Sequence, residues 1–330
     1  MKSIYYFPQK NLMISLPAVL VIAIIVGVLF DTSWLASTVL IATMTMIYPT
    51  MIGIQWKTLL NLDEKKQISF AMIINFIVIP VIALALGYFF LKSEPVLFAG
   101  LALIALLPTS GMTISWTSIS KGNISAAIKL TVFGLILGAV LAPFYLQAMV
   151  GQIVDIQMIT IMRTILMVVF IPLLLGALTT QALKKRFETQ VINKKKKPAL
   201  QSISLWAMHY IIFASISMRA EMIIKNWEMI GLSAVVLILF YTILFALVTW
   251  VAKLFFSKED GLSLIYGTTL RNLSIAMGVG VTSFGMEAAL LITIAFMVQQ
   301  QGVVLYNRFV VQNLFQEKTN FVHKKEKVMN

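Results

Sequence analysis

Long runs of apolar residues alternate with short polar or charged clusters along most of the chain. Ten of these runs approach the length of about 20 apolar residues that a membrane-spanning helix needs. None shows the strict apolar and polar alternation of an outer-membrane barrel strand. The expected spans are residues 11–30, 34–56, 68–91, 96–119, 124–148, 158–183, 200–217, 229–255, 263–284 and 286–311. The pattern therefore predicts an all-α integral membrane protein of about ten transmembrane helices.

Composition supports the same fold class and excludes several others. Apolar residues make up 59% of the 330 residues and charged residues 12%, whereas a soluble domain has about 45–50% and about 25%. We therefore expect the lipid bilayer as the main partner, and no nucleic acid. The chain has no cysteine, which excludes disulfides, thiolate metal sites and thiol catalysis. It also lacks a phosphate-binding loop and a zinc-protease motif, so we expect no catalytic residues, no bound metal and no enzyme.

The positions of lysine and arginine predict the orientation. Most of the 26 basic residues fall in alternate loops and in both terminal segments, which places both termini in the cytoplasm of a multi-pass protein of the cytoplasmic membrane. We expect a first half of five to six helices at 1–183, a basic cytoplasmic loop at 184–199, the remaining helices of a second inverted repeat at 200–312 and a basic tail at 313–330. Ten spans divided into two repeats of five would give the repeats opposite orientations, as in inverted-repeat transporters.

Two spans are interrupted at corresponding positions of the two halves. The fourth span is broken at Pro108–Gly111, and the ninth contains the polar stretch Gly267–Ser274. Hydrocarbon leaves freed backbone groups unsatisfied, so such breaks are typical of cavity-lining or protein-buried segments. Paired breaks indicate a substrate site, and packing kinks are the alternative. Predicted ligands at the breaks are Asn75, Thr109, Ser110, Thr113, Arg271, Asn272 and Ser274.

Three cations lie more than one helical turn inside the expected spans. Arg271 stands in the break of the ninth span, where an unpaired charge costs a few kcal/mol. One interpretation is that Arg271 supplies charge for an anionic substrate, and the other is that it caps carbonyl groups of the fourth-span break. Lys129 and Arg163 lie only one or two turns into their spans, so we expect both to extend toward the headgroups.

Other polar residues in the spans allow two interpretations each. Asn75 could support the two broken segments or join neighbouring helices through its amide. His209 could carry a proton, but a hydrogen-bonded histidine within the bundle is the favoured interpretation. At least one amide of Gln299–Gln301 must face the protein interior. Gly134 and Gly138 form a small-residue face suited to helix packing.

The segments Asn75–Pro80, Pro108–Asn123 and Arg271–Ala276 resemble the bile acid:sodium symporter superfamily, which includes the arsenical-resistance arsenite permeases. The resemblance covers about half of the chain. It implies two inverted five-helix repeats, a panel domain and a core domain, with spans four and nine crossing at the transport site.

The resemblance also shows departures from the family pattern. The sodium-coupled members carry a Glu and a Gln at positions that match Gly267 and Arg271, and an Asn and a Ser at Ile114 and Ala127. The arsenite permeases carry a Cys that matches Thr109 and a Glu that matches Ser274. Na⁺, H⁺ and uncoupled transport all stay open, and we expect no other cofactor. The candidate ion contacts are Thr131, Thr269 and Gln300.

The sequence therefore predicts a secondary active transporter of a small organic anion or oxyanion that works by alternating access. Two alternatives stay open. One is an arsenite or antimonite efflux permease without a thiol ligand. The other is a membrane-embedded binding or sensory subunit that does not transport.

Overall fold

The computed structural model describes residues 5–52, 64–109, 111–153, 158–187, 197–218, 220–225 and 227–311. Within these ranges the regular structure is helical, apart from one isolated antiparallel bridge between Pro108 and Arg271. The described parts of the ten predicted apolar runs are mainly helical, and the fourth and ninth runs are interrupted at residues 107–109 and 270–272. The helices are α2 (Phe7–Lys10), α3 (Leu12–Leu29), α4 (Ala36–Met51), α5 (Lys65–Ile73), α6 (Ile79–Phe90), α7 (Pro95–Leu106), α8 (Gly111–Ile119), α9 (Ile124–Val150), α10 (Met158–Ile165), α11 (Ile171–Arg186), α13 (Lys197–Ser217), α14 (Ala220–Lys225), α15 (Trp227–Phe255), α16 (Lys258–Thr269), α17 (Leu273–Ser283) and α18 (Met286–Leu305).

Several helices have the length and apolar composition of membrane spans. Among the described residues, five helices are long enough to cross a bilayer: Lys65–Phe90, Ile124–Val150, Ala199–Ser217, Trp227–Phe255 and Glu287–Val311. Three shorter apolar helices are Ile14–Leu29, Pro95–Leu106 and Leu273–Ser283. The chain is thus a multi-pass helical membrane protein.

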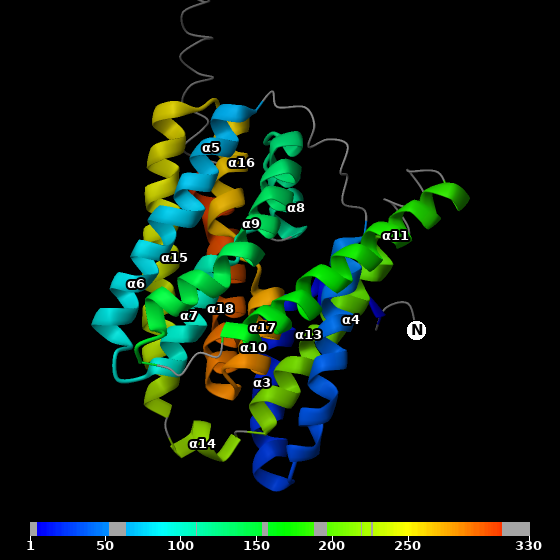
Figure 1. Cartoon of the computed structure of the whole chain (residues 1–330), viewed down its shortest axis with the longest axis vertical. Helices are drawn as coiled ribbons and strands as arrows, with labels where there is room; N and C mark the ends of the chain where they lie inside the picture. The colour runs from blue at the N-terminus through cyan, green and yellow to red at the C-terminus, as the bar shows by residue number, and fades with distance from the viewer. Residues whose placement is uncertain are drawn as a thin grey trace, which may run out of the picture.

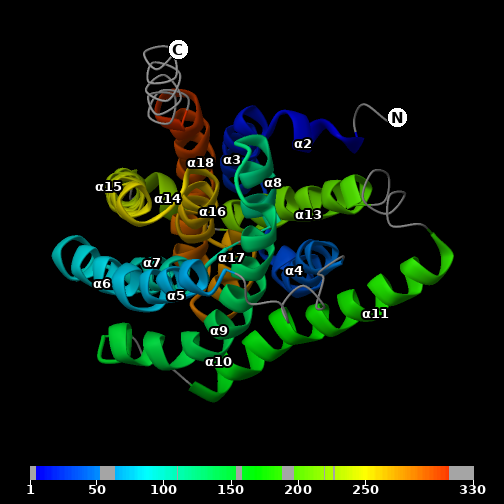
Figure 2. The ribbon, with the colours of Figure 1, turned by 90° about the horizontal axis from the view of Figure 1, so that it is seen from above.

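The helices form two groups that lie side by side. The core bundle consists of α5 to α9 and α15 to α18, which pack mainly on one another. The side bundle consists of α2, α3, α4, α11, α13 and α14, in which α13 packs along α3 and α4. Figures 1 and 2 show α15, α5 and α6 on one side of the molecule and α4, α11 and α13 on the other, with α17 between them.

Hydroxyl and imidazole groups connect helices of the side bundle. The Tyr210 hydroxyl lies 2.6 Å from Thr38 Oγ1, and the Tyr48 hydroxyl lies 2.7 Å from Thr179 Oγ1. His209 is buried, and its two ring nitrogens lie 2.7 Å from the Leu205 carbonyl oxygen and 2.8 Å from Ser15 Oγ. These contacts agree with a histidine that is hydrogen-bonded within the bundle.

A π-helical turn at Ile74–Val78 joins α5 to α6. Pro80 lacks an N–H and would press on the carbonyl group four residues earlier, and a wider turn relieves that conflict. The freed carbonyl oxygen of Phe76 accepts a 2.5 Å hydrogen bond from the Tyr145 hydroxyl of α9. A second π-helical turn, Leu166–Phe170, likewise precedes Pro172. Because the first turn contains Asn75, it carries this side chain in the core bundle, where Asn75 is fully buried.

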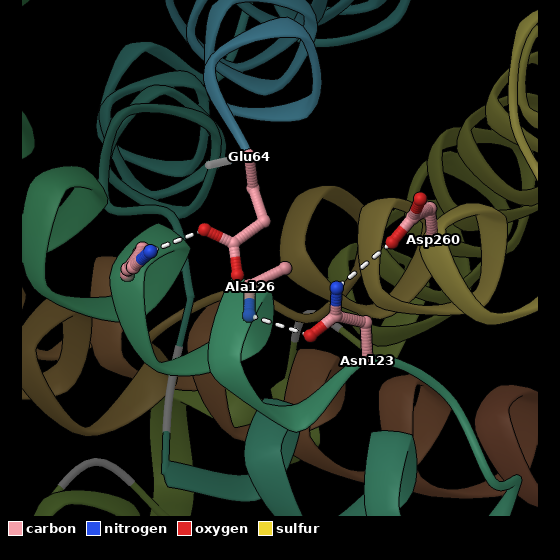
Figure 3. A network of polar contacts seen from close by, with 5 residues as sticks. Glu64, Asn123, Ala126 and Asp260 are labelled. Atoms are coloured by element: carbon pink, nitrogen blue, oxygen red, sulfur yellow. Dashed lines mark hydrogen bonds and ion pairs between the residues drawn. The ribbon is translucent and has the colours of Figure 1, made fainter. Parts of the chain in front are cut away.

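A polar network closes the end of the core bundle at which α5, α9 and α16 begin (Figure 3). Asn123 caps α9 by accepting a 3.0 Å hydrogen bond from the Ala126 N–H, and its Nδ2 donates to Asp260 Oδ1 at 2.9 Å. Lys129 donates to the Glu64 carboxylate. The prediction for Lys129 was therefore wrong: its side chain is only 2% exposed and ion-paired, because the chain brings Glu64 to the start of α5. Arg163, by contrast, is exposed.

The predicted loop at 184–199 is helical at both described ends. Helix α11 continues to Arg186, and α13 begins at Lys197. Residues 188–196, with most of the basic run Lys194–Lys197, and the predicted tail at 313–330 lie outside the described residues.

The packing of α9 against the fourth-span break predicts an effect of enlarging Gly138. A Cβ atom there would lie 2.9 Å from the Leu106 carbonyl oxygen and 2.9 Å from Pro108 Cδ. We expect Gly138→Ala to lower the free energy of unfolding by about 1–3 kcal/mol, because the break must shift. Thermal unfolding of the purified full chain in detergent measures the effect. Gly231→Ala is the matched control, since a Cβ there meets nothing within 4 Å and a helical alanine gains up to about 1 kcal/mol. Equal stability of the two variants would contradict this packing.

The Lys129–Glu64 pair predicts a pH dependence of stability. Burial alone would raise the pKa of Glu64, but hydrogen bonds from Lys129 and Ser125 and the charge of Lys129 hold it below its ordinary value of 4.5. A lowered pKa in the folded state means that this stabilisation is complete above the pKa of the unfolded chain and is lost as the pH falls through the folded value. We expect the thermal midpoint of the wild type to fall on acidification below about pH 5.

Glu64→Gln should remove this component and lower stability at neutral pH by about 3–5 kcal/mol, because Lys129 stays buried without its partner. Glu221→Gln is the control, since that carboxylate is 71% exposed in its pair with Lys225. Identical pH profiles for the wild type and Glu64→Gln would show that the pair contributes nothing.

Candidate functional site

The two predicted breaks meet in the core bundle and pair through their backbones. The Thr109 N–H donates to the Leu270 carbonyl at 3.1 Å, and the Asn272 N–H donates to the Leu107 carbonyl at 2.8 Å. Four half-helices therefore end or begin at one point: α7 and α16 end there, while α8 and α17 begin there. Figure 1 shows α8 and α16 in the upper part of the molecule and α17 below them. We call this point the crossing, formed by residues 107–109 and 270–272.

Pro108 and the pairing at the crossing together remove helical partners from three carbonyl groups. Ile104 would normally accept from residue 108, which is a proline without an N–H. The Ala105 and Thr268 carbonyls would accept from the N–H groups of Thr109 and Asn272, but those donate across the crossing. Buried carbonyls without partners are costly, so the crossing needs donors from a side chain.

Arg271 supplies these donors. Its Nε donates to the Ile104 carbonyl at 3.0 Å, one Nη donates to the Ala105 carbonyl, and the other Nη donates to the Thr268 carbonyl at 2.9 Å. The side chain is 0% exposed. These contacts agree with the second interpretation of Arg271, in which it caps carbonyl groups of the fourth-span break. They also place a positive charge at the negative C-terminal ends of α7 and α16.

Two amide side chains complete the surroundings of Arg271. Asn75 accepts from a guanidinium Nη at 2.5 Å and donates to the Gly267 carbonyl at 3.3 Å. Gln299 of α18 accepts from the Arg271 backbone N–H at 2.7 Å and donates to the Arg271 carbonyl at 3.3 Å. Since Gly267 would normally pair with the N–H of Arg271, the two amides together replace that helical bond.

The threonines near the crossing also satisfy backbone groups. Thr109 has a positive φ of 57°, which is costly for a β-branched residue. Its hydroxyl lies within hydrogen-bonding distance of the Pro108 and Thr131 carbonyl oxygens. Thr113 donates to the Tyr266 carbonyl at 3.2 Å, and the Thr131 and Thr269 hydroxyls each donate to the carbonyl four residues earlier.

Exposure divides the predicted site residues into two sets. The buried set comprises Asn75, Thr109, Thr113, Thr269, Arg271 and Gln300. Of these, Asn75 contacts the guanidinium through its side chain. Gln300 donates to the Met112 sulfur at 3.0 Å. The half-buried set comprises Thr131, Asn272 and Ser274. Ser110 lies outside the described residues. Asn272 caps α17 by accepting from the Ile275 N–H at 3.3 Å.

Two cavities in the described part of the chain lie away from the crossing. One of about 610 Å³ lies where α3, α13 and α14 meet, with Asp31, Ser217 and Glu221 in its lining. Another of about 380 Å³ lies between α4 and α13 and includes Trp206 and Tyr210. Both are in the side bundle, whereas the polar side chains converge in the core bundle. We therefore place the candidate site at the crossing, on the basis of its chemistry.

Sequence reasoning missed the role of Gln299 and its partner Tyr241. The Tyr241 hydroxyl donates to Gln299 Oε1 at 2.9 Å. The three consecutive glutamines carried a signal, since at least one amide had to face the interior. The choice of Gln300 as an ion contact did not identify the amide that holds Arg271, because adjacent positions of a helix point about 100° apart.

The fold and the site define a class: a multi-pass helical membrane protein with two broken helices that pair within its core. Sequence comparison agrees, since the profile of the Sodium Bile acid symporter family matches residues 39–226. This chain belongs to that family. The resemblance to this family that the sequence predicted is thereby confirmed. Membership of the family supports the prediction of a membrane transporter and not an enzyme.

Individual relatives show the same likeness at low identity. The chain is 24% identical over 259 residues to the arsenical-resistance protein Acr3 of Corynebacterium glutamicum, covering 74% of this chain and 70% of that protein. It is 23% identical over 257 residues to the protein YbaS of Bacillus subtilis, covering 75% of this chain and 81% of that protein. The sodium/bile acid cotransporter 7-A of Xenopus laevis is 23% identical over 225 residues, with coverage of 66% and 64%.

The contacts of Gln299 predict its contribution to stability. Gln299→Leu would leave the Arg271 backbone groups and the Tyr241 hydroxyl without this partner in a buried place. We expect the free energy of unfolding to fall by about 2–4 kcal/mol, because each buried unsatisfied group costs about 1–3 kcal/mol. Gln301→Leu on the same helix is the matched control, since Gln301 is exposed and should change stability little. If thermal unfolding gives the same midpoint for both variants, Gln299 does not hold the crossing.

Proposed function

We propose that this chain is a secondary active transporter of the cytoplasmic membrane that moves a small organic anion or oxyanion by alternating access. The observation that carries the proposal is the crossing itself, where the N-terminal ends of α8 and α17 meet beside polar side chains. Helix N-termini present unpaired N–H groups and a partial positive charge, which favour an anion. Broken helices that direct such ends to one point are typical of transporter substrate sites.

The two sets of polar residues have different proposed roles. The half-buried side chains of Thr131, Asn272 and Ser274 contact the solute, together with the N-terminal end of α8. The buried Arg271 and Asn75 hold the geometry of the crossing, and Arg271 contributes its charge to the solute through the electric field. The buried Thr109 and Thr113 reach the solute only if the half-helices move during the transport cycle.

A topology of two inverted five-helix repeats is part of the proposal. The backbone pairing at residues 107–109 and 270–272 is antiparallel, as two oppositely oriented repeats require. Lys65, Lys66 and Lys258 stand at the starts of α5 and α16, which lie at the same end of the molecule in Figure 1. An excess of basic residues at that end favours a cytoplasmic location for it and for both termini.

Arsenite or antimonite efflux without a thiol ligand is a second candidate, favoured by the similarity to Acr3. The chain has no cysteine, so a trivalent metalloid would be bound as its neutral or anionic hydroxide through hydroxyl and amide groups. A non-transporting binding or sensory subunit is the third candidate. It would bind the same solutes without carrying them across the membrane.

Transport in proteoliposomes tests the proposal. The purified full chain is reconstituted, and entry of labelled arsenite, arsenate, taurocholate and acetate is followed against protein-free vesicles. We expect saturable entry of at least one anion. Asn272→Asp should slow this entry by about tenfold or more, because a carboxylate beside the site repels an anion by about 1.4 kcal/mol or more. Aspartate caps a helix as well as asparagine does, so the fold should be kept.

Two control variants separate repulsion from loss of the cap or of surface polarity. Asn272→Ser also keeps a helix cap and adds no charge, and Ser118→Ala changes an exposed residue of α8. Both should transport more than Asn272→Asp does. Equal rates for the wild type and Asn272→Asp would contradict the placement of the solute. Stabilisation of the protein by a probe that never enters the vesicles would support the sensory alternative instead.

A further inference from the structure

The surroundings of the Arg271 guanidinium are those of a cation site. Four oxygen atoms accept its N–H groups: the carbonyl oxygens of Ile104, Ala105 and Thr268, and Asn75 Oδ1. Three of the four belong to the last turns of α7 and α16, which are the negative ends of those half-helices. Neutral oxygens at unwound helix ends are the ligands with which broken-helix transporters coordinate Na⁺.

No carboxylate balances this charge among the described residues. The two ion pairs recorded there are Lys129 with Glu64 and Lys225 with Glu221, and Arg271 is in neither. The positive charge is therefore matched by helix ends and neutral dipoles alone. A second cation at the same oxygens would be repelled by the buried guanidinium at close range. The four oxygen atoms can therefore bind only one positive charge.

From this geometry we infer that Arg271 is a tethered cation that occupies the ion position of the crossing, so that this protein needs no exchangeable monovalent cation there. The guanidinium is covalently attached and cannot dissociate, whereas a bound Na⁺ exchanges with solvent. The inference deepens the proposed function and rests on it only for the consequence that transport through the crossing does not require Na⁺.

The thermal midpoint of the purified full chain in detergent tests the inference without any transported solute. Midpoints are measured in NaCl, KCl and choline chloride at equal ionic strength. A ligand that binds only the folded state raises the midpoint. We expect the wild type to have the same midpoint in all three salts. A higher midpoint in NaCl alone would overturn the inference, whatever the transport assays show.

Arg271→Gln removes the charge and leaves the four oxygens in place. We expect its midpoint in choline chloride to lie about 5 °C or more below that of the wild type, with partial recovery in NaCl or KCl. A folded Arg271→Gln protein that responds to neither salt would overturn the claim that these oxygens form a cation site. Arg163→Gln is the matched control, because Arg163 is exposed on α10, and its midpoint should be independent of the cation.

Arg271→Lys covers the case in which Arg271→Gln yields no folded protein. Lysine keeps a tethered charge but loses the planar set of donors. We expect the lysine variant to fold and to be indifferent to Na⁺. If it fails to fold as Arg271→Gln does, while Arg163→Gln folds normally, the hydrogen bonds and not the charge are what the crossing needs, and the inference is wrong.

Discussion

The structure depends on the hydrogen bonds between Arg271 and the carbonyl groups that two broken helices leave without partners. Pro108 removes the donor that Ile104 would use, and the exchange of N–H groups between the breaks does the same to Ala105 and Thr268. In a membrane-embedded core, each such group would cost several kcal/mol. One guanidinium satisfies all three. The breaks supply the carbonyl oxygens that a buried guanidinium needs, and the guanidinium supplies the donors that these carbonyl groups need.

This arrangement connects packing with function. Gly134 and Gly138 of α9 let the fourth-span break approach closely, since a Cβ at either position would come within about 3 Å of Pro108 or Thr109 atoms. The π-helical turn before Pro80 carries Asn75, which accepts from the guanidinium, and α18 supplies Gln299. Three separate segments, α9, the π-helical turn and α18, therefore hold the two breaks together. The half-buried residues Asn272 and Ser274, which we propose as contacts of the solute, therefore have a rigid support, as a selective polar site requires.

The sequence predicted the ten apolar runs and both breaks, because hydropathy and the Pro and Gly punctuation are local properties of the chain. The sequence also allowed two interpretations of Arg271, but only the three-dimensional structure shows which carbonyl groups the guanidinium contacts. Lys129 was misplaced for the same reason: its partner Glu64 lies 65 residues away in sequence. The choice among Gln299, Gln300 and Gln301 depended on the rotation of α18, which an almost uniformly apolar helix does not reveal. Family membership came from sequence comparison and agrees with the resemblance carried by the break segments.

The central claim is that Arg271 joins the two broken helices by binding their freed carbonyl groups. An experimental density map of the full chain in lipid nanodiscs, at a resolution that shows side chains, tests it most directly. The account predicts a guanidinium enclosed by the carbonyls of Ile104, Ala105 and Thr268 and by Asn75, with residues 107–109 paired to residues 270–272. A guanidinium that points instead into a water-filled space, with the two breaks apart, would contradict it.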